Sequence, residues 1–124
     1  MKFYTCKTCK SIVHFIKDSG VPLICCGKIM EELIPDTSDG ATEKHVPIIK
    51  QNGNHVLVEV GSVPHPMLDV HYIEWIILET ERGFQKVNLK PGMEPKAEFL
   101  LTENDRVIDA YEYCNIHGLW KSNK

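Results

Sequence analysis

Short runs of alternating apolar and polar residues, separated by turn residues, make up most of this 124-residue chain. Alternation of this kind predicts β-strands that bury one face. We expect six such strands, at residues 46–51, 55–60, 71–80, 83–89, 96–102 and 106–113. Asn52-Gly53-Asn54 is a strong hairpin signal between the first two. No stretch has the apolar period of a long amphipathic helix, so we predict an all-β fold, a sandwich or a barrel.

The first 36 residues are interpreted as a separate small domain. A strand is expected at residues 11–16, and Asp18-Ser19-Gly20 is a turn signal. Residues 34–42 are polar and rich in turn formers, which indicates a linker. We therefore expect a domain at 1–36 and a larger one at 37–124. Because 36 residues cannot bury a sufficient core, a bound metal would have to stabilise the small domain.

Composition and charge exclude several classes of function. A net charge of −3 argues against nucleic-acid binding, which needs a basic surface. No apolar run approaches the roughly 20 residues that span a bilayer, so no membrane association is expected. No apolar signal segment precedes Cys6, so we expect a cytoplasmic protein. In that reducing compartment, five cysteines are more typical of metal sites or reactive thiols than of disulfides.

Four of the cysteines form a candidate metal site in the small domain. Cys6 and Cys9 are separated by two residues, and Cys25 and Cys26 are adjacent. Four thiolates satisfy a tetrahedral zinc or iron ion. Neighbouring side chains of an extended chain point in opposite directions, so the backbone must bend at the adjacent pair. The spacing leaves iron, a structural zinc ion and, less in keeping with the compartment, a disulfide framework open.

The remaining cysteine and four histidines form a second candidate site. Cys114 and His117 lie three positions apart in a loop expected after the last strand, and His45, His65 and His71 lie upstream. Five candidate ligands exceed the usual set of four around zinc. A nitrogen-rich site with one thiolate suits iron of higher coordination number. Our hypothesis is that these segments converge on one iron ion with an open position for a small ligand.

Two charged residues, Glu43 and Lys44, precede the first of these histidines. Lys44 would attract a small anion, and Glu43 could occupy the open position or take part in proton delivery. Alternatively, both could be surface residues of little energetic effect. An isolated buried histidine is usually a hydrogen-bonded core residue, and we interpret His14 and His55 as ordinary histidines because no flanking signal singles them out.

The combination of motifs resembles the desulfoferrodoxins, the two-iron superoxide reductases, over nearly the whole chain. Tyr4-Thr5-Cys6-Lys7-Thr8-Cys9 with Cys25-Cys26-Gly27 is similar to the desulforedoxin-like domain of that family. Four further phrases are similar to its neelaredoxin-like catalytic domain: Glu43-Lys44-His45-Val46-Pro47, Gly61-Ser62-Val63-Pro64-His65-Pro66-Met67, His71-Tyr72-Ile73-Glu74-Trp75 and Cys114-Asn115-Ile116-His117-Gly118-Leu119-Trp120.

The resemblance implies an immunoglobulin-like β-sandwich for the catalytic domain, a homodimer and two iron ions per chain. It implies reduction of superoxide to hydrogen peroxide, with electrons from a rubredoxin-type donor. A non-catalytic iron would be held by the four clustered cysteines, Cys6, Cys9, Cys25 and Cys26. The catalytic iron would have His45, His65, His71 and His117 in its equatorial plane and Cys114 as axial ligand. Glu43 would be the sixth ligand of the ferric state, and Lys44 would steer superoxide and support its protonation.

Other functions give different expectations. A pure two-iron electron carrier would have no exchangeable position at the second site, so azide or cyanide would not change its oxidised spectrum. A zinc-stabilised binding module without catalysis would contain zinc and no iron. A superoxide dismutase would produce oxygen as well as peroxide and consume no external reductant.

Overall fold

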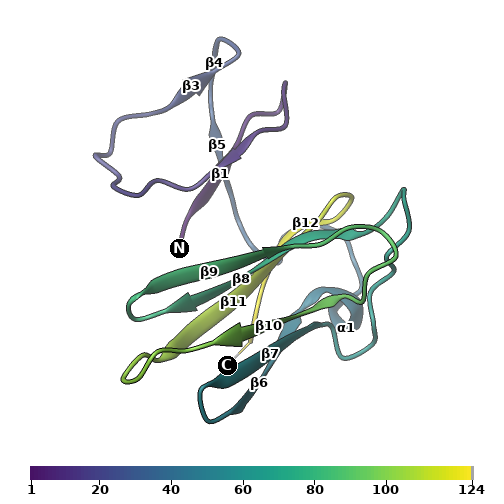
Figure 1. Ribbon diagram of the computed structural model, residues 1–124. Helices are drawn as coiled ribbons and strands as arrows, with labels where there is room; N and C mark the ends of the chain where they lie inside the picture. Colours follow the sequence, from purple (N-terminus) through teal and green to yellow (C-terminus); the bar gives the residue numbers. More distant parts are fainter. Residues whose placement is uncertain (124) are drawn as a thin grey trace. The chain divides into compact units, whose positions relative to one another are not determined.

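The computed structural model describes residues 1–123 and is almost wholly β, which confirms the expected all-β class (Figure 1). The chain divides into two compact units, Met1–Ile34 and a second that begins at Pro35. This division lies two residues before the boundary expected from the sequence, inside the predicted linker. The described residues contain no helix long and apolar enough to cross a membrane.

The first unit consists of two small antiparallel sheets. In one, β1 (Phe3–Thr5) lies between β2 (Ile12–Val13) and β5 (Glu31–Leu33). In the other, β3 (Ile24–Cys25) pairs with β4 (Lys28–Ile29). The strand expected at 11–16 is therefore much shorter than predicted. The expected turn at Asp18-Ser19-Gly20 is present, because the Gly20 amide donates to Asp18 Oδ1 at 2.8 Å.

The second unit contains a three-stranded and a four-stranded antiparallel sheet (Figure 1). The three-stranded sheet has the order β10-β7-β6, with bounds β6 (Pro47–Asn52), β7 (His55–Val60) and β10 (Lys96–Leu100). Asn52 pairs with His55 across a two-residue turn, and Gly53 has a φ of +61°, which confirms the predicted hairpin.

The four-stranded sheet completes a sandwich over one apolar core. Its order is β12-β11-β8-β9, with bounds β8 (Ile73–Thr80), β9 (Gly83–Asn88), β11 (Val107–Cys114) and β12 (Gly118–Lys121). Buried side chains of both sheets form one cluster that includes Val58, Phe99, Ile76, Leu78 and Cys114. Two antiparallel sheets that share such a core are the arrangement of an immunoglobulin-like sandwich.

Four details near the ends of strands differ from the sequence prediction. His71 does not open a strand: it forms an isolated bridge with Leu68, and β8 begins only at Ile73. Cys114 does not lie in a loop, because it is the last residue of β11. A further strand, β12, follows it. The short helix α1 (Thr42–His45) was also not predicted.

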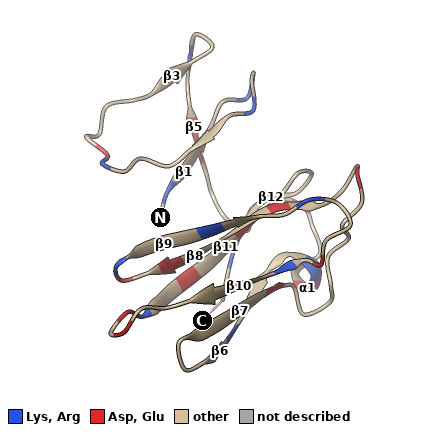
Figure 2. Ribbon diagram, viewed as in Figure 1, with Lys and Arg blue, Asp and Glu red and all other residues tan. Residues whose placement is uncertain are grey.

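Charged residues of both signs are interspersed along the strands and loops (Figure 2). The basic positions do not form a separate block of sequence, in keeping with the net charge of −3. In α1, Glu43 and Lys44 are both exposed, whereas the neighbouring His45 is buried.

Candidate metal centres

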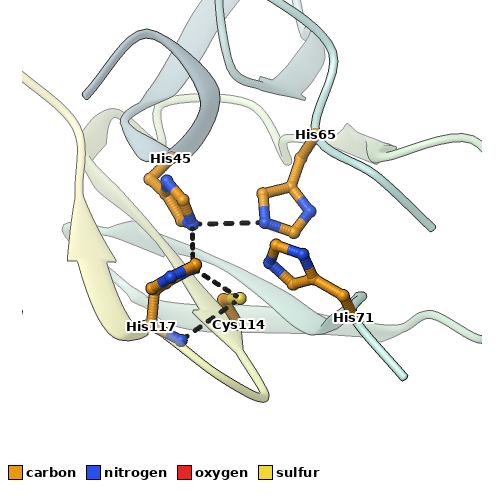
Figure 3. Close-up of side chains that lie close together, drawn as sticks. All are labelled: His45, His65, His71, Cys114 and His117. Atoms are coloured by element: carbon orange, nitrogen blue, oxygen red, sulfur yellow. Dashed lines mark hydrogen bonds between the residues drawn. The ribbon is translucent and has the colours of Figure 1, made fainter. Parts of the chain in front are cut away.

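Five side chains that the sequence singled out lie together in the second unit (Figure 3). Each offers one nitrogen or sulfur atom, and these atoms all lie within 4.8 Å of one another: they belong to His45, His65, His71, Cys114 and His117. Figure 3 shows the four imidazoles arranged around a common space, with the sulfur of Cys114 close to His117. The convergence required by the sequence hypothesis is therefore present.

Each of these residues is placed by a different element. His45 ends α1, and Cys114 ends β11. His117 lies in the turn between β11 and β12, which is closed by the pairing of Cys114 with Gly118. His65 follows β7, and its amide donates to the carbonyl of Val60 at 2.9 Å. His71 lies ahead of β8, in the bridge with Leu68.

The backbone fixes the tautomers of two of the histidines. Nδ1 of His45 lies 2.8 Å from the carbonyl oxygen of Ala41, and Nδ1 of His65 lies 2.6 Å from that of Pro66. A carbonyl oxygen can only accept, so each Nδ1 carries a proton and each Nε2 presents a lone pair. These two Nε2 atoms are 3.2 Å apart. Because neither carries a proton, they cannot form a hydrogen bond, and their lone pairs repel each other. A cation between them would remove their repulsion.

The third histidine supports the same interpretation. Nε2 of His71 is buried and has no hydrogen-bond partner within the described residues. An unsatisfied buried polar atom costs about 1–3 kcal/mol. Nδ1 of His117 also points into the group, 3.0 Å from Nε2 of His45 and 3.8 Å from the sulfur of Cys114. A bound metal ion would satisfy all of these atoms, so the donor set fits one.

Burial sets the protonation of the group. It lowers the pKa of His45 and His71, and it lowers the pKa of His65 to about 4. These imidazoles are therefore neutral near pH 7, the form that binds metals. Burial raises the pKa of the Cys114 thiol, although the amide of His117, 3.4 Å from the sulfur, opposes this. Metal binding at Cys114 would therefore release a proton.

Three residues outside the ligand set enclose the group. Trp120 stacks on His45, and its indole Nε1 donates to the carbonyl of His117 at 3.1 Å. The hydroxyl of Ser38 donates to the same carbonyl. At Gly40, a Cβ atom would lie 3.1 Å from the rings of His45 and Trp120. In the sequence, Trp120 is the last residue of the Cys114–Trp120 motif, whereas Ser38 and Gly40 lie in the segment interpreted as a linker.

The exposed residues Glu43 and Lys44 act on this site through their charges. The carboxylate of Glu43 is not one of the converging atoms, but its charge opposes the burial that lowers the pKa of His45. The pKa of His71 is lowered mainly by burial, and the charges of His117 and Lys44 lower it further. Neither His14 nor His55 belongs to either cluster of candidate ligands in the described chain.

The first unit contains the second cluster, in which Cys6, Cys9, Cys25 and Cys26 offer sulfur atoms within 4.8 Å of one another. The sulfur of Cys25 lies 3.6 Å from that of Cys9 and 4.0 Å from that of Cys26. All five cysteines of the chain lie in the described residues and are free, so there is no disulfide framework.

The backbone of this cluster has the bend that adjacent ligands require. Cys26 has a φ of +53° and Gly27 one of +75°, so both adopt the left-handed conformation. The Ser11 hydroxyl beside Cys9 lowers the pKa of that thiol to about 6, whereas the thiol of Cys9 raises the pKa of Cys25 to about 12. Four thiolates this close would repel one another strongly. A divalent or trivalent cation would remove that repulsion, and both zinc and iron fit.

Comparison with known proteins identifies relatives along the whole chain. The family model described as desulfoferrodoxin matches residues 37–123. A desulfoferrodoxin homolog from Archaeoglobus fulgidus is 48% identical over 122 residues, which cover 98% of this chain and 96% of the relative. The desulfoferrodoxin of Nitratidesulfovibrio vulgaris is 47% identical, and the match covers 98% of this chain and 94% of the relative.

Solved structures give the same result for the fold. The superoxide reductase from Treponema pallidum is 35% identical, has a TM-score of 0.82 and covers 98% of both chains. The superoxide reductase (1Fe-SOR) from Giardia intestinalis is 37% identical, has a TM-score of 0.56 and covers 64% of this chain and 95% of its own. With a family model that matches most of the second unit and relatives that span both units, the chain belongs to the desulfoferrodoxin family.

Proposed function

We propose that this protein is a superoxide reductase. It would convert superoxide to hydrogen peroxide at an iron ion held by His45, His65, His71, Cys114 and His117. The single observation that carries the proposal is the convergence of four imidazoles and one buried thiol within 4.8 Å. The Treponema pallidum protein, similar over 98% of this chain, is named a superoxide reductase.

The reaction adds one electron and two protons to superoxide and yields hydrogen peroxide. Iron bound at this site would supply the electron by changing between its ferrous and ferric states. The protein would hold the donor set in place: the carbonyls of Ala41 and Pro66 orient two rings, and the buried thiolate of Cys114 supplies electron density. The His117 amide, 3.4 Å from that sulfur, stabilises its negative charge.

The charged residues of α1 would act on the substrate. Superoxide is an anion, so the exposed ammonium group of Lys44 would raise its local concentration and favour its protonation. Glu43 would be a further ligand of the oxidised site. The effect of both charges on the pKa of histidines in the site supports their placement in this role.

The four-cysteine cluster would hold a second iron ion, so that each chain carries two. We propose that this iron is not catalytic and relays electrons from a rubredoxin-type donor. The protein would act in the cytoplasm, in defence against oxidative stress. We further propose a homodimer. The pair Ile24 and Ile29, opposite each other on β3 and β4 and 66% and 63% exposed, supports an apolar contact surface in the first unit.

Metal content measured together with peroxide yield tests the proposal. A superoxide reductase supplied with external reductant yields one peroxide for each superoxide consumed and releases no oxygen. A dismutase would yield half as much peroxide and release oxygen, and an electron carrier would not consume superoxide. Zinc in place of iron at both sites would also contradict the proposal.

A further inference from the structure

The segment Gly61-Ser62-Val63, which we call the Gly61–Val63 turn, lies between β7 and His65 and carries no candidate ligand. We propose that this turn is a positioning element that holds Glu43 and Lys44 in place beside the metal site. The inference rests on the function proposed for those two charged residues. It assigns a role to the part of the Gly61–Met67 motif that precedes the histidine.

The carbonyl oxygen of Glu43 is the point of attachment. It accepts a hydrogen bond from the amide of Val63 at 2.9 Å and another from the hydroxyl of Ser62 at 3.2 Å. The amide of Gly61 donates to the carbonyl of Val63 at 3.2 Å and so closes the turn. Both hydrogen bonds to the Glu43 carbonyl therefore come from a turn that has its own backbone hydrogen bond.

The helix α1 needs such an attachment because it is only four residues long. A single helical turn is not stable alone in water. Two backbone hydrogen bonds join it to the residues that flank it: the amide of Lys44 donates to the carbonyl of Ala41 and that of Val46 to the carbonyl of Thr42, both at 3.0 Å. Within residues 1–123, no side chain caps its N-terminus. Its orientation is therefore set by its surroundings, and the Gly61–Val63 turn is the contact that acts at Glu43 itself.

Gly61 allows the turn to lie close to the backbone of α1. A Cβ atom there would lie 2.7 Å from the carbonyl oxygen of Glu43 and 3.1 Å from backbone atoms of Lys44 and Val46. A distance of 2.7 Å is below any ordinary carbon–oxygen contact, so either the turn or α1 would have to move. The φ of Gly61 is not in the left-handed region. The requirement for glycine is therefore one of space.

The same segment also places a candidate ligand. His65 directly follows Pro64, and its amide donates to the carbonyl of Val60, the last residue of β7. Val60 in turn pairs with Pro47, which follows α1. One short stretch of chain thus sets the position of the charged residues relative to a histidine of the site.

The test uses Ser62→Ala, which removes one of the two donors and leaves the Val63 amide to satisfy the carbonyl. Ser62→Thr retains the hydroxyl, and Ser19→Ala, at an exposed turn of the first unit, is a matched control. Gly61→Ala is a stronger change. If it fails to fold, the serine variants still decide the question.

The first measurement is amide hydrogen exchange, which does not depend on superoxide chemistry. Loss of a hydrogen bond should speed exchange of the Lys44 and Val46 amides about fivefold in Ser62→Ala. Exchange should be unchanged in Ser62→Thr and in the control. Equal exchange rates in Ser62→Ala and the parent protein would overturn the inference.

The second measurement is a double-mutant cycle on the rate of reaction with superoxide. If Ser62 acts through Lys44, Ser62→Ala should lower the rate and its salt dependence in the parent chain. It should have no further effect in a Lys44→Ala chain. Equal losses in both chains would refute positioning through Lys44. If the parent itself does not react with superoxide, the proposed function fails, and the exchange measurement still decides whether the turn anchors α1.

Discussion

The indole of Trp120 lies against the imidazole of His45, with ring centroids 4.9 Å apart and planes inclined by 28°. The same indole donates from Nε1 to the carbonyl of His117. One buried side chain therefore contacts two of the candidate ligands. Packing that restricts the rings before the metal binds lowers the entropy cost of binding.

Trp120→Phe should weaken metal binding at the histidine site. Phenylalanine keeps an aromatic ring beside His45 but cannot donate to His117, so the turn that carries His117 loses one restraint. Loss of an outer partner of a metal site typically lowers affinity about tenfold or more. Competition with a chelator of known affinity measures the change.

The matched control is Trp75→Phe, because Trp75 stacks on Tyr113, which is not a candidate ligand, with ring centroids 5.7 Å apart. It should bind metal as the parent does. Equal losses of affinity in the two variants would mean that the stacking on His45 has no specific role.

The strands were predictable where the alternation was long and a turn signal bounded it. β7 was expected at its observed residues, and Gly53 identified the hairpin. The elements that were missed are short. α1 and β12 have four residues each, too few for either periodicity to appear. Burial by neighbouring elements determines their structure, and such long-range contacts are absent from local sequence patterns.

For the site, the sequence identified every side chain that now lies in the two clusters, because cysteine and histidine are the residues that bind these metals. It did not identify the carbonyls of Ala41 and Pro66 that fix the ring tautomers. Every residue has a carbonyl, so these partners leave no mark in the sequence. The bend at Cys26 was predictable, because adjacent ligands cannot otherwise reach one ion.

His71→Leu should abolish metal binding at the histidine site without destabilising the metal-free protein. Nε2 of His71 is buried and unsatisfied, so an apolar side chain of similar size removes a cost of about 1–3 kcal/mol in the metal-free state. Metal analysis and the denaturant midpoint of the metal-free protein measure the two effects.

His55→Leu provides the comparison, since His55 is partly exposed and lies 3.7 Å from Glu98, away from both clusters. It should retain both metals. A His71→Leu protein that keeps its full metal content, or that is much less stable than the parent in the metal-free state, would contradict the role assigned to His71.

Cys9→Ser should remove the metal of the first unit and loosen that unit alone. Its buried apolar side chains are only Phe3, Cys6 and Met30, too few to stabilise it without a metal. Hydrogen exchange of the β1 amides should rise, while exchange in β8 should stay slow. Superoxide reduction should continue when reductant is plentiful.

Lys7→Ala controls for the loss of any side chain near this cluster. Lys7 lies between Cys6 and Cys9 and forms an exposed ion pair with Glu31, of little expected energy. This variant should keep its metal. If Cys9→Ser stopped superoxide reduction even with excess reductant, the first site would be needed for turnover, and its proposed relay role would be wrong.

Lys44→Ala should slow the reaction with superoxide in a manner that depends on salt. Its exposed ammonium group attracts the anion over a distance comparable with the Debye length, so the loss should be about tenfold at low ionic strength. The difference from the parent should shrink as salt screens the charge. Lys86→Ala, at an exposed position of β9, removes the same charge elsewhere and should change the rate little. Stopped-flow rates at several ionic strengths distinguish the two variants. If Lys44→Ala and Lys86→Ala slow the reaction equally, the rate depends only on net charge, and Lys44 does not steer superoxide to the metal site.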